Sequence, residues 1–185
     1  MVSHELDKGC ERPEEVLERI VTILMTYSDH GIIMSYPNAD QGHHAIIDWL
    51  NQWQQMMPDR ILLRQSFGSQ NYLSAMEHAD VVIGNSSSAL LEAPSLKTAS
   101  VNVGNRQGGR IAAESVIHCE TDKASIDQAI KQALTTEFQK LCETVNNPYD
   151  RGSASQAVIR VLKFEHLHQV KTFQDLPMPN PQISF

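Results

Sequence analysis

The segment VVIGNSSSALLEAP, residues 81–94, decides the class of fold. Its first three residues form a short apolar run that ends at Gly84, which is typical of a buried strand. A polar run, residues 85–88, follows and leads into a short helical pattern that Pro94 ends. A buried strand followed directly by a helix is the repeating unit of a parallel α/β sheet.

The same alternation continues on both sides of this segment. Because each expected strand is apolar throughout, helices must cover both faces of the sheet. The sequence therefore predicts the α/β class, with a doubly wound, Rossmann-like parallel sheet. We expect a domain over residues 1–168 and an extended or disordered tail over residues 169–185, where three prolines lie. The other expected strands are 32–34, 61–63, 99–103 and 116–117, and the other expected helices lie around 13–24, 46–57, 72–76, 126–134 and 157–162.

Composition excludes several classes of function. Of the 185 residues, 41% are hydrophobic and 20% are charged, which excludes wholesale disorder. With 15 basic and 22 acidic residues the formal net charge is -7, so we expect no nucleic acid as partner. No apolar stretch approaches the roughly 20 residues of a membrane helix and no apolar signal region opens the chain, so we expect a cytoplasmic protein that binds no membrane. Cys10, Cys119 and Cys142 form no CxxC pair, which favours inert thiols and predicts no metal site.

Three loops follow expected strands, where doubly wound sheets bind ligands: residues 37–40, 84–88 and 104–110. In the second loop, Ser86, Ser87 and Ser88 open a helix whose first N–H groups can receive a phosphate, and their hydroxyls can add hydrogen bonds. The alternative is simple helix capping, for which one serine suffices.

The loop 104–110 carries two arginines among three glycines. Arg106 and Arg110 are suited to gripping a phosphate with a bidentate fork, and the alternative is a solvated turn. Together the two loops indicate a diphosphate or a nucleotide. Glu92 can then accept hydrogen bonds from two ribose hydroxyls, or it is a surface helix residue.

The serine loop also invites comparison with the nucleophile turn of hydrolases. The GxSxG pattern is not met, because position 88 is serine rather than glycine. A hydrolase would need a histidine and an acid in later loops, and although His118 lies near a strand end, nothing marks its acidic partner. A serine hydrolase is therefore the weaker interpretation.

Several runs of this chain, in fixed order, match the motifs of one enzyme family. They are residues 82–88, 92–96 and 101–110, with 37–42 upstream and 147–149 downstream. These runs resemble the UDP-N-acetylglucosamine 2-epimerase family, over residues 4–165. Asn-Ser-Ser-Ser at 85–88 and Arg-Gln-Gly-Gly-Arg at 106–110 are similar to its hydrolysing branch, whereas the other branch tends to show Asp-Ser-Gly-Gly and Thr-Glu-Arg-Pro.

The resemblance implies the C-terminal half of a glycosyltransferase-B-like enzyme with its site in a cleft between two domains. Such an enzyme removes the proton at sugar C2, expels UDP and adds water, which gives N-acetylmannosamine or a related sugar for sialic-acid-like pathways. It implies no cofactor, a UDP or UDP-sugar partner and a possible homo-oligomer. The proton-handling carboxylates belong mainly to the N-terminal domain, so the catalytic residues are unknown here.

Residue by residue, the resemblance implies contacts with UDP. Ser86 and Ser87 match diphosphate-binding serines, and Glu92 matches the ribose-binding acid. The remaining expected contacts with UDP are Arg106, Ser88 and Arg110 from the same two loops, Asn38 near the uridine and Tyr72 near the base. His4 lies close to the position of a phosphate-binding histidine in the family. In the family this histidine ends a strand, which residues 1–3 would begin here.

Three functions stay open on the sequence. The first is the UDP-binding half of a hydrolysing 2-epimerase, inactive when isolated. The second is a non-catalytic homologue that acts as a nucleotide-binding or regulatory module. The third is a glycosyltransferase-like domain for nucleotide sugars.

Overall fold

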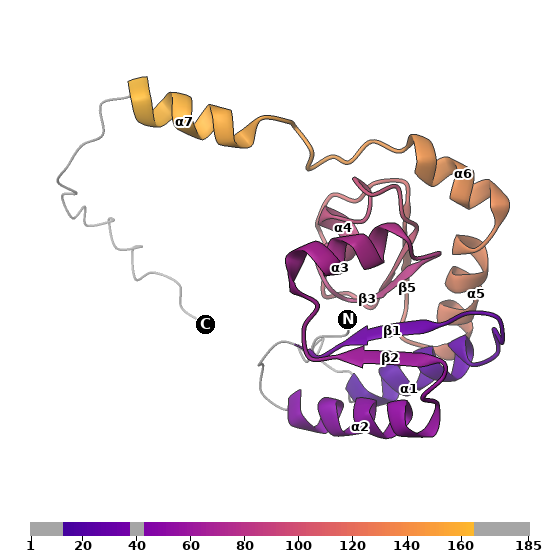
Figure 1. Ribbon diagram of the computed structural model, residues 1–185. Helices are drawn as coiled ribbons and strands as arrows, with labels where there is room; N and C mark the ends of the chain where they lie inside the picture. The colour runs from indigo at the N-terminus through magenta and orange to yellow at the C-terminus, as the bar shows by residue number, and fades with distance from the viewer. Residues whose placement is uncertain (1–12, 38–42, 165–185) are drawn as a thin grey trace, which may run out of the picture. The chain divides into compact units, whose positions relative to one another are not determined.

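The computed structural model describes residues 13–37 and 43–164 (Figure 1). The chain divides into two units, residues 1–150 and residues 151–185. All described strands belong to the first unit. The boundary expected after residue 168 lies outside the described residues and stays a prediction.

Five strands lie where the apolar runs predicted them, and every described pairing is parallel. Within the described residues they form a two-stranded sheet, β1-β2, and a three-stranded sheet, β3-β4-β5. Helices separate most of them along the chain, so the predicted parallel α/β class is confirmed. The strands are β1 (Ile32–Ser35), β2 (Ile61–Arg64), β3 (Val82–Gly84), β4 (Ser100–Val103) and β5 (Val116–Cys119).

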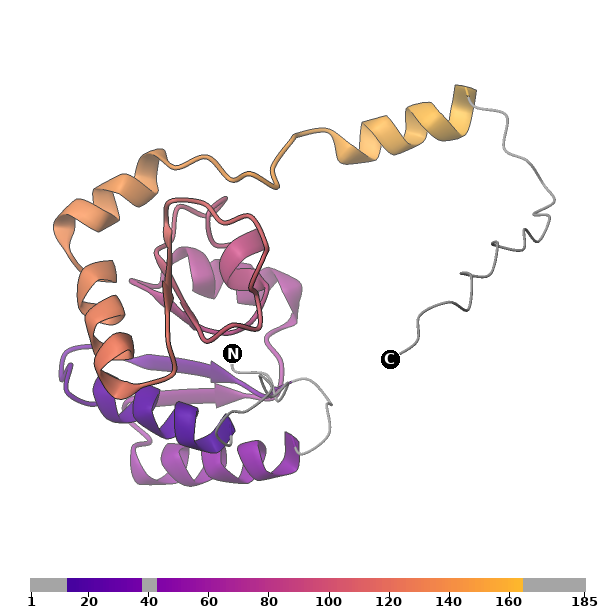
Figure 2. The ribbon, with the colours of Figure 1, turned by 180° about the vertical axis from the view of Figure 1, so that it is seen from behind.

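Helices cover two faces of these strands. The main core joins α1, α2 and α5 to the apolar side chains of β2 and β4. In Figure 1, α3 lies in front of the strands, whereas Figure 2 brings α1 and α5 to the front. The helices of the first unit are α1 (Pro13–Leu24), α2 (His43–Met56), α3 (Gly68–Glu77), α4 (Ser88–Leu91), α5 (Lys123–Ala133) and α6 (Thr136–Thr144).

The helix α6 was not expected from the sequence. Its turns carry few apolar residues, and only Cys142 is buried in it. The side chain of Thr135 accepts a hydrogen bond from the Phe138 N–H at 3.3 Å and so caps the helix. The expected helix at 126–134 corresponds to α5, and the Thr135 cap begins a further helix directly after it.

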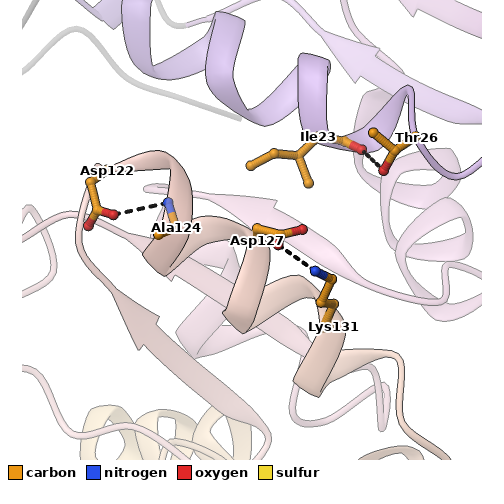
Figure 3. Close-up of polar contacts among 6 residues, drawn as sticks. All are labelled: Ile23, Thr26, Asp122, Ala124, Asp127 and Lys131. Carbon is orange, nitrogen blue, oxygen red and sulfur yellow. Dashed lines mark hydrogen bonds and ion pairs between the residues drawn. The ribbon is translucent and has the colours of Figure 1, made fainter.

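The start of α5 shows how a side chain fixes a helix end. The Asp122 carboxylate accepts hydrogen bonds from the backbone N–H groups of Ala124 and Ser125, each at 3.0 Å. Figure 3 shows the first of these bonds and, one turn later, the Asp127–Lys131 pair at 2.6 Å. Because that pair is exposed, it contributes little to stability.

The second unit holds α7 (Ala154–Phe164) in its described part. The helix is amphipathic, and none of its residues is buried. The expected helix at 157–162 is thus confirmed, with a longer span.

Candidate functional site

The serine loop begins where β3 ends. Gly84 has φ = 151°, a conformation that favours glycine, and Asn85 is 8% exposed. The Ser86 hydroxyl accepts a long hydrogen bond of 3.4 Å from the Ser88 N–H. Ser87, the residue before α4, makes no capping bond with its side chain. Helix capping therefore accounts for one serine at most.

The helix that follows this loop is short. Since α4 spans four residues, its dipole is small, and little attraction for an anion comes from it. Any phosphate here would rely on local donors, the backbone N–H groups of the loop and the hydroxyls of Ser87 and Ser88. Those hydroxyls have no hydrogen-bond partner among the described residues.

The arginine loop is attached to the same strand end. Arg106 Nη1 donates to the Asn85 carbonyl oxygen at 3.2 Å, and Gln107 Nε2 donates to the same oxygen at 2.8 Å. The structure thus brings together the serine loop and the arginine loop, 21 and 22 residues apart along the chain. Gln107 is 3% exposed, and no sequence pattern singled it out.

Within the arginine loop, a close turn favours glycine at position 108. A Cβ added at Gly108 would lie 2.2 Å from Asn105 Oδ1 and 3.0 Å from the Asn105 carbonyl oxygen. The backbone N–H of Arg110 donates to the Gln107 carbonyl at 3.2 Å, and the Arg110 residue is exposed. The arginine loop is therefore a folded turn, and Arg106 and Gln107 attach it to Asn85, next to the end of β3.

Glu92 lies directly after α4 and is partly buried. One carboxylate oxygen, Oε2, is buried and has no hydrogen-bond partner. A buried, unpaired acceptor is costly, so it indicates donors that the described protein atoms do not supply. The assignment of Glu92 to ribose stays a prediction, with its partly buried position in its favour.

A second segment far along the chain packs on α4. Asn147 Nδ2 donates to the Leu91 carbonyl at 2.8 Å and to Ser95 Oγ at 2.7 Å. The Tyr149 hydroxyl donates to the Ile111 carbonyl at 2.9 Å. Residues 147–149 therefore tie the end of α4 to the chain just after the arginine loop.

One of the other predicted contacts, Tyr72, is not joined to these loops. Tyr72 lies on α3, is partly buried and lines a cavity of about 630 Å³. No hydrogen bond connects its side chain to the serine loop in the described residues. His4 and Asn38 lie outside the described residues.

Sequence reasoning missed a buried amide beside the arginine loop. Asn102 is 1% exposed, and its Nδ2 donates to the Gly104 carbonyl at 3.2 Å and to His118 Nδ1 at 3.1 Å. Its Oδ1 is buried without a partner. Because His118 pairs with Asn102 rather than with a serine, the structure gives no support to a serine hydrolase.

Two thiols match the expectation of inert cysteines. Desolvation raises the pKa of Cys119 to about 11, with the charges of Asp122 and Glu120 adding to it. Burial also raises the pKa of Cys142. Over residues 13–37 and 43–164, no three His, Cys, Asp or Glu side chains are grouped to hold a metal ion.

Comparison with known proteins identifies the family. The model of the UDP-N-acetylglucosamine 2-epimerase family matches residues 4–163, which include every loop of the candidate site. The chain belongs to this family. The resemblance seen in the motifs is thereby confirmed.

Two curated relatives give the scale of the similarity. Polysialic acid biosynthesis protein P7 of Escherichia coli is 30% identical over 167 residues, which are 89% of this chain and 42% of that protein. The GDP/UDP-N,N'-diacetylbacillosamine 2-epimerase (hydrolyzing) of Campylobacter jejuni is 32% identical over 137 residues, 74% of this chain and 35% of that protein. The chain thus spans less than half the length of these relatives.

A solved structure confirms the fold of this family member. The crystal structure of the Methanocaldococcus jannaschii UDP-GlcNAc 2-epimerase in complex with UDP-GlcNAc and UDP matches with a TM-score of 0.59 and 17% identity. The match covers 82% of this chain and 41% of that one. The predicted Rossmann-like, glycosyltransferase-B-like fold is therefore confirmed. Among the described helices, none has the length and apolar character to cross a bilayer.

Proposed function

We propose that this chain is the UDP-binding part of a hydrolysing UDP-N-acetylglucosamine 2-epimerase. The observation that carries the proposal is the attachment of Arg106 and Gln107 to the Asn85 carbonyl, which places the arginine loop against the serine loop. The family membership and the Campylobacter jejuni relative, which is described as hydrolyzing, support it.

The chemistry assigned to this part is the handling of the leaving group. When the C–O bond between the sugar and UDP breaks, negative charge grows on the diphosphate. N–H and hydroxyl groups of Ser86 and Ser87 would stabilise that charge, and Arg106 would add a fixed positive charge. Glu92 Oε2, buried and without a partner, would accept hydrogen bonds from the ribose hydroxyls.

The complete reaction needs further groups. Removal of the proton at C2 requires a base, and the return of a proton requires an acid. In the hydrolysing reaction water then adds to the glycal, which gives N-acetylmannosamine or a related sugar for a sialic-acid-like pathway. We assign no base or acid to the described residues.

Isothermal titration calorimetry tests the anion site. UDP should bind at least about tenfold more tightly than UMP, because the second phosphate meets charge-assisted donors of the two loops. The variant Ser86→Ala/Ser87→Ala should reduce this preference, whereas Ser155→Ala, on an exposed part of α7, should leave it unchanged. Equal affinity for UDP and UMP would contradict the proposal.

A further inference from the structure

A row of three residues crosses the three-stranded sheet at the edge that carries the serine loop and the arginine loop. Gly84 of β3 is in register with Asn102 of β4, and Asn102 is in register with His118 of β5. The serine loop begins at Gly84, and the arginine loop begins at Gly104. His118 therefore lies at the carboxyl ends of the strands, where parallel sheets bind their ligands.

The side chains of Asn102 and His118 lie on the face of this sheet that α4 covers. Two residues earlier on the same strands, Ser100 Oγ donates to the Ala89 carbonyl at 2.8 Å, and Val116 lies in one apolar cluster with Ala89. Since side chains alternate along a strand, residues two positions apart share a face. Because α4 begins at the end of the serine loop, His118 and the serine loop are at the same edge and on the same face of the sheet.

Asn102 fixes which ring nitrogen of His118 carries the proton. Its Nδ2 lies 3.2 Å from the Gly104 carbonyl oxygen and 3.1 Å from His118 Nδ1. A carbonyl oxygen only accepts hydrogen bonds, so the amide atom beside Gly104 must be the nitrogen, which donates both of its hydrogens. His118 Nδ1 therefore accepts, and the proton of the neutral imidazole is on Nε2.

The other ring nitrogen of His118 is left to bind a ligand. The residue is exposed, and among the described residues its ring makes a hydrogen bond only with Asn102. Ionised phosphate oxygens accept hydrogen bonds, so a directed N–H group suits them. Arg106 brings a positive charge to the same edge of the sheet, and the neutral imidazole adds a hydrogen bond of fixed direction.

We propose that His118 binds the diphosphate of the ligand through Nε2–H, and that Asn102 is a positioning residue that holds the imidazole in this tautomer. The inference rests on the proposed function, because it adds a donor to the same anion site. Neighbouring strands are about 4.8 Å apart, so the ends of β3 and β5 are separated by about 10 Å. Two linked phosphates span this edge better than one does, which assigns a nucleoside diphosphate as the class of ligand.

Calorimetry with variants of the full chain tests the contact. His118→Ala should weaken UDP binding at least about tenfold, the loss of a hydrogen bond to a charged group, and should change UMP binding less than about twofold. His118→Gln, whose Nε2 can replace the ring nitrogen as donor, should bind UDP within about threefold of the unsubstituted chain. The matched control is His78→Ala, an exposed histidine before β3 at the opposite edge of the sheet, which should leave both affinities unchanged.

The same titrations separate this inference from the proposed function. A preference for UDP over UMP that His118→Ala leaves intact would overturn the role of His118 alone. If the unsubstituted chain binds UDP and UMP equally, the anion site itself fails, and the inference fails with it.

Nitrogen-15 NMR of the His118 ring tests the role of Asn102 without a ligand. At about pH 8, where an ordinary histidine is neutral, the full chain should show only the tautomer with the proton on Nε2. Asn102→Leu removes the donor to Nδ1 at similar side-chain volume, so it should give a mixture of both tautomers. A mixture in the unsubstituted chain, or a proton on Nδ1, would overturn the proposal, and this reading decides even if Asn102→Leu fails to fold.

Discussion

At the scale of single residues, one backbone carbonyl joins the two halves of the candidate site. The Asn85 oxygen receives Gln107 Nε2 at 2.8 Å and Arg106 Nη1 at 3.2 Å. Asn85 itself is nearly buried, so this junction is shielded from water. Glu92 Oε2 is the contrasting case, a buried acceptor that no described group satisfies.

The substitution Glu92→Gln tests the assignment of this acceptor to ribose. It should weaken UDP binding by about 1–3 kcal/mol, the range for a lost charge-assisted hydrogen bond. Binding of inorganic diphosphate should change little, because that ligand has no ribose. Calorimetry with both ligands measures the difference.

The exposed carboxylate of Glu114 supplies the control for this substitution. Glu114→Gln should leave the affinity for both ligands unchanged. If Glu92→Gln instead weakens UDP and diphosphate equally, Glu92 does not bind the ribose.

Cys119 should react slowly with alkylating reagents. Its pKa of about 11 keeps the thiol protonated at pH 8, and the thiolate is the reactive form. We expect alkylation by iodoacetamide at least roughly tenfold slower than that of N-acetylcysteine at the same pH. Peptide mass spectrometry at several times follows this site alone, and a rate equal to the reference would show that the thiol is not desolvated.

At the scale of elements, the arginine loop depends on a buried side-chain bond rather than on packing. Gln107→Ala removes the donor to the Asn85 carbonyl and should lower the free energy of unfolding by about 1–3 kcal/mol. It should also weaken UDP binding, because the loop loses its attachment to the strand end. Urea denaturation measures the first effect and calorimetry the second.

The matched control is Gln128→Ala on the exposed side of α5. Because an exposed glutamine contributes little, this variant should keep both the stability and the UDP affinity. If the two substitutions change the stability and the UDP affinity equally, Gln107 has no special role in attaching the arginine loop.

The N-cap of α5 should make stability sensitive to acid. Hydrogen bonds from the side chain and backbone N–H of Ser125, and from the Ala124 N–H, lower the pKa of Asp122 from 3.8. The capping carboxylate stabilises the folded state above the unfolded pKa, and this stabilisation is lost as the pH falls through the lower folded pKa. Asp122→Asn keeps a cap and should show less acid loss, measured by thermal unfolding between pH 2 and 6.

Asp122→Ala gives the complementary comparison. It removes the cap at every pH, so its melting temperature should be a few degrees lower than that of Asp122→Asn even at pH 6. Identical melting temperatures of the two variants at pH 6 would show that the cap does not stabilise α5.

At the scale of the whole molecule, the groups proposed to stabilise the leaving group are distinct from the groups that transfer protons. Among the described residues in or near the three predicted loops, the acids are Glu92 and Glu114, and Glu92 already has a proposed ribose role. A site that stabilises UDP without a base at C2 leaves most of the barrier in place. We therefore expect the isolated 185-residue chain to bind UDP and to release no N-acetylmannosamine from UDP-N-acetylglucosamine.

Chromatography of the sugar products measures this prediction. Fusion of the chain to the N-terminal half of a family member should give turnover, which would favour an enzyme part over a nucleotide-binding module. Release of N-acetylmannosamine by the isolated chain would show that its own residues supply the base and the acid.

The sequence by itself determined most elements of the first unit and the family. Apolar runs such as 61–63 and 81–83, bounded by turn residues, predict strands, and they alternate with amphipathic helices. The loop motifs also depend on local order along the chain, so they identified the family before any contact was known. The helix α6 was missed because its apolar face is short: Cys142 is its one buried residue, and Phe138 packs against the same core.

Only the tertiary structure decided how the loops meet. The bond between Gln107 and the Asn85 carbonyl joins positions 22 residues apart, and no local pattern predicts which buried amide reaches which carbonyl. Glu92 Oε2 and Asn102 Oδ1 are likewise buried without a hydrogen-bond partner only because neighbouring elements cover them. The order of the described strands has the same cause, because it depends on pairing between distant segments rather than on the pattern within any one strand.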